Sequence, residues 1–284
     1  MTDTPFLSRR ERFASVGSTN DIVRSWLEAG TPEVCLAVAD EQTAGRGREG
    51  RSWTAAPGAG LLLSLGFRPS WLEPDRTWRL AAIAALAMAE AAEQVAGLAD
   101  GAIRLKWPND LVVEGTTVRK LGGLLGETVG LGMDDPRAII GIGVNADWQR
   151  ADFPPELADG MTSLREVADG RPIDPDAVLE AFLVRLEART MALRAGRFDA
   201  DGWVARQVTT GRTIRLHGPD GRSSHVRALG VDPDGGGLIV DGPAADGGPR
   251  TILTGEIVHL RLMDGSAADG SAVDGRPVVE SVRV

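Results

Sequence analysis

A glycine-rich segment carries three arginines within six residues: Arg46, Arg48 and Arg51. Guanidinium groups match the geometry of phosphate and carboxylate groups, and glycines let a backbone wrap closely around a ligand. The like charges repel one another in an empty loop, so we expect the loop to order when an anion neutralises them. A solvated surface loop is the alternative, but the glycine spacing and the nearby Trp53 favour a binding loop.

The run from Gly45 to Gly50 also satisfies the G-x-G-x-x-G pattern of dinucleotide-binding folds. That function needs glycines that open a helix directly after a strand. Here the chain continues through Trp53 into an apolar run at 61–67, which predicts a strand and not a crossover helix. The sequence therefore argues against a Rossmann fold.

Only two of the 31 basic residues are lysines, Lys106 and Lys120. A lysine ammonium makes a point contact to a phosphoryl oxygen, whereas arginine offers a planar fork. The two lysines of this arginine-biased chain therefore indicate phosphate contacts, although chance retention explains two residues equally well. Both lie in unusual local sequences, Lys-Trp-Pro-Asn-Asp from Lys106 and Lys-Leu-Gly-Gly from Lys120.

Ser18, Thr19 and Asn20 directly precede apolar residues at helical spacing, which predicts a helix from about Asp21 to Gly30. In the simplest interpretation these polar residues supply the helix N-cap. The first helical N–H groups would point into the same space as these side chains, so a cap and a ligand site are compatible there.

The remaining pattern predicts an α+β fold with a mixed or antiparallel sheet. Further helices are expected over 78–95 and 174–193. Strands are expected over 34–39, 61–67, 103–107, 111–114, 118–128 and 138–144. Because the links between the last four strands are short, those strands favour antiparallel pairing.

The character of the sequence changes near residue 205. Short strand-like runs at 213–216, 225–230, 237–240 and 251–260 are separated by glycine-rich turns, a pattern typical of a small β-barrel. The last residues repeat Asp, Gly, Ser and Ala, which predicts a flexible tail. We therefore expect a large domain over 1–205, a β-barrel over 206–263 and a tail over 264–284.

The composition excludes several classes of function. With 31 basic and 40 acidic residues the net charge is −9, so neither nucleic acid nor a membrane is expected as a partner. One cysteine and three histidines cannot form an internal disulfide or a typical closed zinc site. The most apolar helical stretch, 80–92, is too short to span a bilayer, and the charged N-terminus lacks the apolar run of a signal peptide. We expect a soluble, cytoplasmic protein.

Five segments together resemble the motifs of the biotin protein ligases, in the order and spacing of that family. They are Ser18–Asn20, Asp40–Arg48, Lys106–Asp110, Arg119–Gly123 and Gly141–Asn145. The resemblance spans about residues 15–150, and Gly255–Arg261 resembles part of the family's small SH3-like domain.

The resemblance implies a class II synthetase-like catalytic domain with a C-terminal SH3-like β-barrel. Such enzymes adenylate biotin with ATP and Mg²⁺ and then transfer it to a lysine of a biotin carboxyl carrier protein. The match begins near the start of this chain, so we expect a monofunctional form without an N-terminal DNA-binding domain, as a monomer or weak homodimer. A lipoate or octanoate ligase and a non-catalytic biotin-binding sensor are the alternatives.

The resemblance also implies a role for individual residues. Biotin binding is expected of Ser18, Thr19, Asn20, Gln42, Arg46, Gly47, Arg48, Lys120 and Gly123. Binding of ATP or the adenylate is expected of Arg48, Arg51, Trp53, Lys106, Asn109, Asn145 and Arg261. The expected catalytic residues are Lys120, Arg48, Lys106 and Asp110, with Asp110 also a metal ligand. In one departure from the family, Glu49 stands where relatives often have a basic residue, which lowers the charge of the loop.

This chemistry requires the residue types that the sequence supplies. A carboxylate must approach the α-phosphate of ATP, so cations must offset the repulsion between two anions. A unit charge pair at ~4 Å is worth about 1 kcal/mol in water and about 4 kcal/mol at an effective dielectric of ~20, so a loop that excludes water strengthens every cation. The 44–53 loop would also shield the adenylate from hydrolysis. Either Lys120 or Asp110 can assist deprotonation of the carrier lysine.

Overall fold

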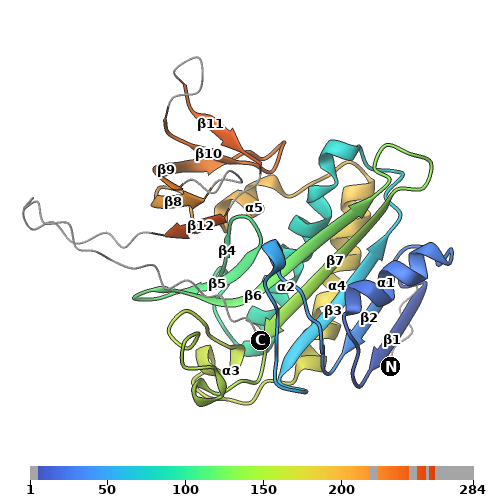
Figure 1. The fold of residues 1–284 in the computed structure, drawn as a ribbon, viewed down its shortest axis with the longest axis horizontal. Helices are drawn as coiled ribbons and strands as arrows, with labels where there is room; N and C mark the ends of the chain where they lie inside the picture. Colours follow the sequence, from blue (N-terminus) through green and yellow to red (C-terminus); the bar gives the residue numbers. More distant parts are fainter. Residues whose placement is uncertain (1–5, 218–222, 243–247, 254–255, 260–284) are drawn as a thin grey trace, which may run out of the picture.

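The computed structural model describes residues 6–217, 223–242, 248–253 and 256–259. A seven-stranded sheet forms the centre of the larger part of the molecule, and a five-stranded sheet lies beside it (Figure 1). This arrangement confirms the predicted α+β class with a mixed sheet. Arg261 and the expected tail at 264–284 lie outside the described residues.

The helices and strands follow the predicted order closely. The helices are α1 (Thr19–Glu28), α2 (Trp78–Ala96), α3 (Leu164–Val167), α4 (Pro175–Arg194) and α5 (Ala200–Ala205). The strands of the larger sheet are β1 (Arg9–Phe13), β2 (Cys35–Ala39), β3 (Gly60–Phe67), β4 (Ile103–Lys106), β5 (Asp110–Glu114), β6 (Val118–Val129) and β7 (Arg137–Asn145). The strands of the smaller sheet are β8 (Thr213–His217), β9 (Ser223–Val231), β10 (Leu238–Val240), β11 (Arg250–Ile252) and β12 (Glu256–His259).

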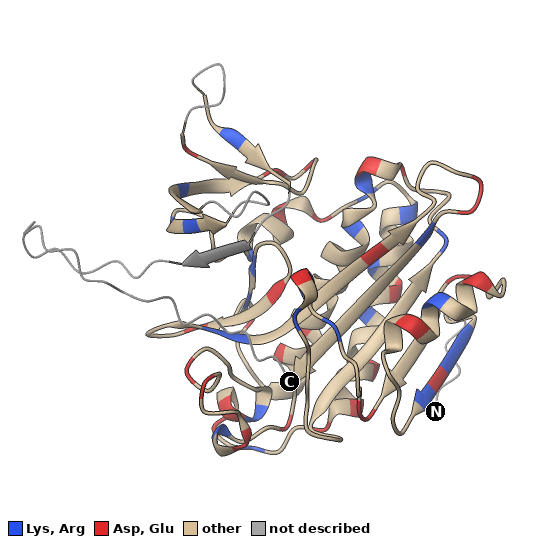
Figure 2. Ribbon diagram, in the orientation of Figure 1, with Lys and Arg blue, Asp and Glu red and all other residues tan. Residues whose placement is uncertain are grey.

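The larger sheet has the strand order β1-β2-β3-β7-β6-β5-β4. Strands β4 to β7 pair antiparallel in sequence order, as their short links predict. The edge strand β1 pairs with β2 in parallel, which makes the sheet mixed. The sequence analysis did not predict β1, because its sequence Arg-Arg-Glu-Arg-Phe lacks an apolar pattern. Figure 2 shows the charge along β1, in contrast to the nearly uncharged central strands.

The two faces of the larger sheet differ because side chains alternate along each strand. Leu36 and Val38 of β2 point toward the face covered by α2 and α4, where the main hydrophobic core lies. Cys35 and Ala37 point toward the face covered by α1. In β7 the α2/α4 face receives Ile140, Ile142 and Val144, and Gly141 and Gly143 lie at the alternate positions. The face under α1 is therefore built from smaller residues, which leaves space above it.

Helix α2 shows why the apolar pattern was sufficient to predict this core. Its alanine-rich sequence is buried on nearly every side, because it packs between the sheet and α4. It ends at Gly97, which adopts the left-handed conformation that glycine favours at a helix C-terminus. In the described part of the chain, no helix is both long enough and apolar enough to cross a membrane.

The smaller sheet has the order β11-β10-β9-β8-β12. The predicted strand at 251–260 is wrong in one respect, since β11 and β12 are separate strands at opposite edges of this sheet. The β9–β10 turn contacts the larger part directly: the indole of Trp107 donates a hydrogen bond to the carbonyl of Gly236, with Nε1···O at 3.1 Å. The indole of Trp78 donates to the carbonyl of Asp234 at 3.3 Å. The five-stranded sheet is therefore anchored next to the Lys106–Asp110 segment.

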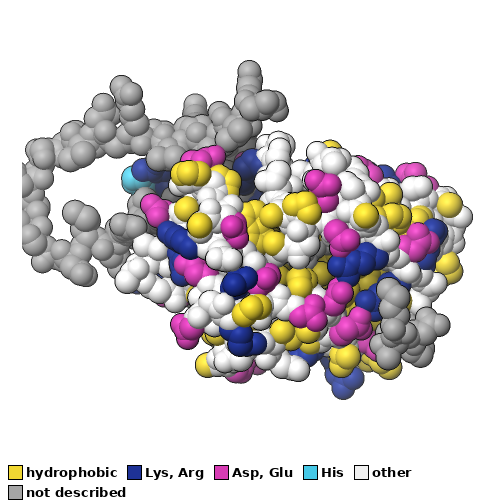
Figure 3. Space-filling model, turned by 90° about the horizontal axis from the view of Figure 1, so that it is seen from below, with side chains coloured by type: hydrophobic (Ala, Val, Ile, Leu, Met, Phe, Trp, Pro, Cys, Tyr) yellow, Lys and Arg dark blue, Asp and Glu magenta, His cyan; other side chains and the backbone are white. Residues whose placement is uncertain are grey.

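Charged side chains of both signs are distributed over the surface. Figure 3 shows acidic and basic side chains interspersed over one face of the molecule. Many form ion pairs across elements, such as Arg10 with Glu180 and Arg12 with Asp176. A mixed surface of this kind agrees with the modest negative net charge of the sequence.

Candidate active site

A cavity of about 1270 Å³ gathers the chemically interesting residues of the sequence. Its wall includes the start of α1, the loop that precedes β3, and parts of β5, β6 and β7. Of the residues expected from the sequence, it is lined by Ser18, Thr19, Asn20, Gln42, Arg46, Gly47, Arg48, Arg51, Trp53, Lys106, Asn109, Asp110, Lys120 and Gly123. Segments up to about 100 residues apart in the chain therefore meet at one site.

One end of the cavity is a compact group of neutral polar side chains. Gln42 Oε1 accepts hydrogen bonds from the backbone N–H of Thr19 at 2.8 Å and from its hydroxyl at 2.9 Å. Ser64 Oγ, in the middle of β3, lies 2.7 Å from Thr19 Oγ1 and 2.6 Å from Asn20 Oδ1. Ser18 precedes the helix as its N-cap residue, but its side chain makes no capping hydrogen bond. The arrangement offers hydroxyl and amide groups in fixed orientations, which suits a neutral polar ligand.

Glycines of β7 make room for this polar group. Gly141 is paired with Ser64 in the β3–β7 register, and a Cβ atom at Gly141 would lie 2.3 Å from Asn20 Oδ1. No other residue fits there without displacing the Asn20 amide. Two residues further along β7, a Cβ atom at Gly143 would lie 2.5 Å from Nε1 and Cε2 of Trp53. The Gly-Ile-Gly pattern of β7 is therefore required by what packs above the strand.

The glycine–arginine loop forms a hairpin across the cavity. Trp53 N–H donates to the carbonyl of Gly45 at 2.9 Å, and Gly47 N–H donates to the carbonyl of Arg51 at 2.6 Å. A Cβ atom at Gly45 would lie 2.2 Å from the carbonyl oxygen of Trp53, so the close approach of the two arms requires glycine. No helix follows the loop before β3, which confirms that the G-x-G-x-x-G pattern is not part of a Rossmann fold.

The outer part of the hairpin carries Arg48 and Arg51, and its base carries Trp53. The indole Nε1 of Trp53 is buried and has no hydrogen-bond partner among the described residues. The Trp53 ring covers part of the wall between Gly143 and Lys120, as expected for an apolar cover.

The two strands opposite the hairpin supply a lysine–carboxylate pair. Lys120 Nζ lies 2.8 Å from Asp110 Oδ1, and both side chains are partly buried. The Lys120 ammonium also lies 5.3 Å from the centre of the Trp53 ring. A bulge in the β5–β6 pairing between Leu111 and Val112 shifts the register next to this pair. A Cβ atom at Gly123 would lie 3.3 Å from Lys120 Nζ and 3.4 Å from Asp110 Oδ1, so glycine leaves the pair open to the cavity.

Lys106 lies at the end of β4, immediately before the turn into β5. Asn109 holds the turn by two hydrogen bonds to Leu124. Its side-chain amide donates to the Leu124 carbonyl at 2.6 Å, and its backbone carbonyl accepts from the Leu124 N–H at 2.9 Å. Trp107 is buried beside it and anchors the smaller sheet. The Asn109 amide is therefore already engaged with the backbone, so its expected ATP contact remains a prediction.

One expected residue in the described part of the chain, Asn145, does not line the cavity. Asn145, at the end of β7, is buried, and its amide donates to the carbonyl of Thr162 at 3.0 Å. This contact ties the end of the strand to the segment before α3, which is a structural role. Arg261 lies outside the described residues, so its expected nucleotide contact remains a prediction.

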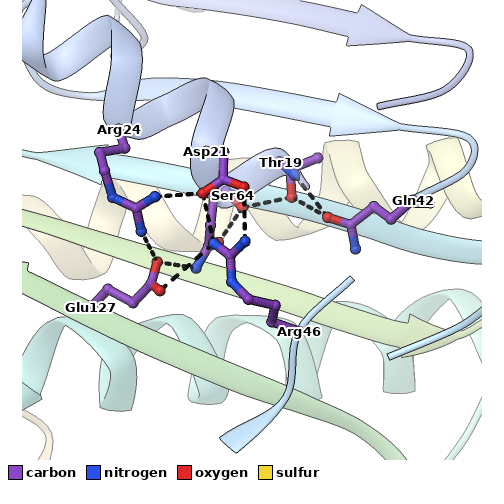
Figure 4. Close-up of polar contacts among 8 residues, drawn as sticks. Thr19, Asp21, Arg24, Gln42, Arg46, Ser64 and Glu127 are labelled. Atoms are coloured by element: carbon purple, nitrogen blue, oxygen red, sulfur yellow. Dashed lines mark hydrogen bonds and ion pairs between the residues drawn. The ribbon is translucent and has the colours of Figure 1, made fainter. Parts of the chain in front are cut away.

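Sequence reasoning missed an ionic group at the rim of the cavity. Asp21, Arg24 and Glu127 interact there with Arg46 and Asn20 (Figure 4). Hydrogen bonds from Arg46, followed by those from Arg24, hold the pKa of Asp21 below its ordinary value despite an opposing contribution from burial. Asp21 could have been found from the sequence, because it directly follows the Ser-Thr-Asn motif. Glu127 has no such local signal, because it is a single acidic residue in β6 that only the folded sheet brings to this place.

The carboxylates at the site decide whether it can bind the expected Mg²⁺ ion. Among the described residues, no three Asp, Glu, His or Cys side chains are grouped so as to hold a metal ion. Asp110 offers one carboxylate to the cavity, and one of its oxygens already contacts Lys120. Mg²⁺ is usually bound by one or two carboxylates together with substrate phosphates. A single carboxylate therefore fits a Mg²⁺ ion that enters with a nucleotide.

Comparison with known proteins adds an independent observation. The model of the Biotin/lipoate A/B protein ligase family matches residues 13–145. The biotin–[acetyl-CoA-carboxylase] ligase of Mycobacterium tuberculosis is 32% identical over 253 residues, which cover 87% of this chain and 88% of that protein. The bifunctional ligase/repressor BirA of Bacillus subtilis is 34% identical over 222 residues, which cover 78% of this chain and 66% of that protein. The chain thus spans just under two thirds of the length of the Bacillus relative.

A solved structure shows the same fold with ligands bound. The biotin protein ligase from Aquifex aeolicus in complex with biotin and ATP superposes with a TM-score of 0.71 and 27% sequence identity. The superposition covers 89% of this chain and 99% of that chain. The likeness therefore extends over nearly the whole of the ligand-bound protein.

Proposed function

Because the chain belongs to the biotin/lipoate A/B protein ligase family, we propose that it activates biotin with ATP and transfers the biotinyl group to a lysine of a biotin carboxyl carrier protein. One observation carries the proposal: a single cavity holds a neutral polar end, an arginine hairpin and the two lysines of the chain. The arginines and lysines suit a carboxylate and a phosphate, and the neutral polar end suits a ring amide. The cavity brings these groups together in one place.

Biotin binds with its ureido ring at the neutral end. The ureido group has two N–H donors and one carbonyl acceptor, and Ser18, Thr19, Asn20 and Gln42 offer both donors and acceptors there. Ser64 fixes the orientation of Thr19 and Asn20 from below. The biotin carboxylate then points toward Lys120 and the hairpin, where the cations are.

In the first step, a biotin carboxylate oxygen attacks the α-phosphorus of ATP. A phosphorus–oxygen bond forms to biotin, the bond to the β-phosphate breaks, and pyrophosphate leaves. Lys120, Lys106 and Arg48 offset the repulsion between the two anions and stabilise charge on the transferring phosphoryl group. Arg51 and Trp53 bind the nucleotide from the hairpin side. Asp110 would hold a Mg²⁺ ion that enters with ATP, and the ion would supply further positive charge there.

In the second step, the ε-amine of a carrier lysine attacks the carbonyl carbon of the biotinyl adenylate. A carbon–nitrogen bond forms, the carbon–oxygen bond to AMP breaks, and the nitrogen releases a proton. Lys120 and Asp110, which pair with each other and line the cavity, would assist the removal of this proton. The hairpin excludes water until the carrier arrives, which protects the mixed anhydride from hydrolysis.

The proposal extends to the organisation of the chain. Residues 206–263 form an SH3-like barrel that includes the described five-stranded sheet, and residues 1–205 form the catalytic domain. The enzyme acts in the cytoplasm as a monomer or weak homodimer, without a nucleic-acid or membrane partner. The contact of Trp107 with Gly236 supports a structural link between the barrel and the nucleotide end of the cavity.

A transfer assay tests the proposed function. Purified full-length chain is incubated with ATP, Mg²⁺, labelled biotin and the carrier domain of an acetyl-CoA carboxylase. We expect ATP-dependent label on the carrier lysine and none on a carrier in which that lysine is replaced by arginine. Labelled lipoate and octanoate serve as competing substrates. Transfer of lipoate or octanoate in place of biotin would support the alternative ligase, and tight biotin binding without transfer would support a sensor.

A further inference from the structure

A buried ion pair outside the cavity joins separate segments of the chain. Nη1 of Arg206 lies 2.6 Å from Oε1 of Glu93, and Nη2 lies 2.9 Å from Oε2 of the same carboxylate. Glu93 belongs to α2, and Arg206 directly follows α5. Only 4% of Glu93 and 8% of Arg206 are exposed. Neither is among the described residues that line the cavity, so the proposed reaction gives the pair no role.

The pair also binds the first residue of β4. The backbone N–H of Ile103 donates to Oε1 of Glu93 at 2.8 Å, and the carbonyl of Ile103 accepts from Nη1 of Arg206 at 2.8 Å. Strand β4 lies at the edge of the larger sheet, beside β5 (Figure 1). The carboxylate and the guanidinium therefore supply the donor and acceptor that a further strand would supply at Ile103.

The backbone around Arg206 completes this outer edge of β4. The N–H of Leu105 donates to the carbonyl of Arg206 at 2.9 Å, and the N–H of Val208 donates to the carbonyl of Leu105 at 2.8 Å. The guanidinium of Arg104 donates to the same Arg206 carbonyl at 3.2 Å. Arg206 thus binds β4 twice, at Ile103 through its side chain and at Leu105 through its backbone.

Lys106 is the last residue of the strand that this pair holds. On the inner side of the strand, β4 pairs with β5, and Lys106 is opposite Asp110. Because partners occupy both edges of β4, the strand has one register, and Lys106 enters the cavity wall at a fixed place. The ion pair at the start of β4 therefore determines where the Lys106 side chain begins.

The energetics of buried charge favour a positioning role over a purely stabilising one. Transfer of two charges out of water is costly, so a buried ion pair is often no more stabilising than a well-packed apolar pair. The planar fork of arginine binds a carboxylate in one orientation, which gives the pair a defined geometry. An apolar pair would also leave the N–H and carbonyl of Ile103, a completely buried residue, without these partners.

We propose that Glu93 and Arg206 are positioning residues that hold β4 in register and so place Lys106 in the cavity. They act through the backbone of Ile103 and Leu105. The contact of Lys106 with ATP rests on the proposed function, whereas the register of β4 does not.

Calorimetric titration of this chain with ATP and Mg²⁺, and separately with biotin, tests the role. Glu93→Gln keeps the size of the side chain and removes its charge, and we expect ATP to bind about tenfold more weakly. Biotin affinity should stay within about twofold of the parent, because the neutral polar end of the cavity is built on α1 and β3. Equal losses of affinity for both ligands would indicate general destabilisation and overturn the proposal.

The matched control is Glu90→Gln, which removes a glutamate of the same helix from its ion pair with Arg189. Both affinities should stay within about twofold of the parent, because this partly exposed pair does not contact β4. Equal ATP affinity in Glu90→Gln and Glu93→Gln would overturn the proposal.

A double variant tests whether the pair acts through Lys106. Glu93→Gln combined with Lys106→Ala should weaken ATP binding no more than Lys106→Ala alone, and additive effects would overturn the proposal. If Glu93→Gln impairs folding, Glu93→Gln with Arg206→Met takes its place, because that variant leaves neither charge of the pair buried alone.

Hydrogen exchange without ligand provides a readout that does not depend on the proposed function. The amides of Leu105 and Val208 should exchange about tenfold faster in Glu93→Gln than in Glu90→Gln. Equal exchange in the two variants would overturn the role in holding β4. A parent chain that shows the expected exchange but neither binds ATP nor transfers biotin would overturn the proposed function and leave the register of β4 intact.

Discussion

Lys120 Nζ lies 2.8 Å from Asp110 Oδ1, between neighbouring strands that a bulge brings out of regular register. The pair faces the cavity beside Gly123 and the ring of Trp53. An ammonium that donates one N–H to a carboxylate still has two N–H donors for a ligand. The relationship places a fixed ammonium where the proposed reaction joins a carboxylate to a phosphate.

Replacement of Lys120 by alanine should lower kcat/KM for biotin transfer at least tenfold. The change removes one or two charge-assisted contacts, and tenfold corresponds to about 1.4 kcal/mol of transition-state stabilisation. Lys120→Arg should recover only part of the rate, because a planar fork cannot reproduce the point contact. Steady-state kinetics with a carrier domain measure the effect, and unchanged turnover in Lys120→Ala would remove this residue from the site.

Replacement of Gly141 by alanine should weaken biotin binding about tenfold or more. The new Cβ atom would lie 2.3 Å from Asn20 Oδ1, so the amide must leave its place beside Ser64. Gly126→Ala in β6 is the matched control, since a Cβ atom there meets only Ile140 Cδ1 at 3.7 Å. Calorimetric titration with biotin compares the two variants. Equal affinities would show that the Asn20 amide does not bind the ring.

The ion pair between Arg46 and Asp21 should be insensitive to pH until the solution becomes distinctly acidic. Arg46 and Arg24 hold the pKa of Asp21 below its ordinary value of 3.8, with Glu127 as the other acid of the group. Because the pKa of Asp21 is lowered in the folded protein, the stabilisation from its ion pair with Arg46 is complete above the ordinary pKa of 3.8. This stabilisation is lost as the pH falls toward the lowered pKa. Exchange protection of 44–53, corrected for intrinsic rates, should therefore be constant from pH 8 to pH 5. Loss of protection between pH 7 and pH 6 would point to another titrating group.

Cys35 should resist alkylation in the native protein. The thiol is completely buried in β2 under α1, and burial raises its pKa to about 11. At pH 8 roughly one thiol in a thousand would be ionised, and the reagent cannot reach it without local unfolding. Mass spectrometry after treatment with iodoacetamide should show no adduct until denaturant is added. Rapid modification at pH 8 would indicate that α1 opens readily from the sheet.

The parts of the fold that could be predicted are those where local pattern and tertiary role agree. Helix α2 is apolar and periodic, ends at a glycine, and is buried as that pattern indicates. Strand β1 could not be predicted, because it is an edge strand whose charged side chains remain partly exposed. The last predicted strand, at 251–260, is divided in the structure, because β11 ends at Ile252 and β12 begins at Glu256.

The residues of the candidate site also divide into those with a local sequence signal and those without one. Its loops carry unusual compositions, so the arginine hairpin and the Lys106–Asp110 segment could be located from the sequence alone. Ser64 and Glu127 are single polar residues in strands, and only the register of β3, β7 and β6 brings them to Asn20. The contacts of Ser64 and Glu127 with Asn20 join residues more than 40 positions apart in the chain, which local pattern does not encode.

A crystal structure of this chain with biotinyl-5′-AMP bound would show whether the cavity holds the adenylate. We expect the ureido ring between Asn20 and Gln42, the acyl phosphate within hydrogen-bond distance of Lys120 Nζ, and the 45–53 hairpin over the ligand. An adenylate bound elsewhere, or bound in this cavity with Lys106 and Lys120 both directed into bulk solvent, would contradict the account.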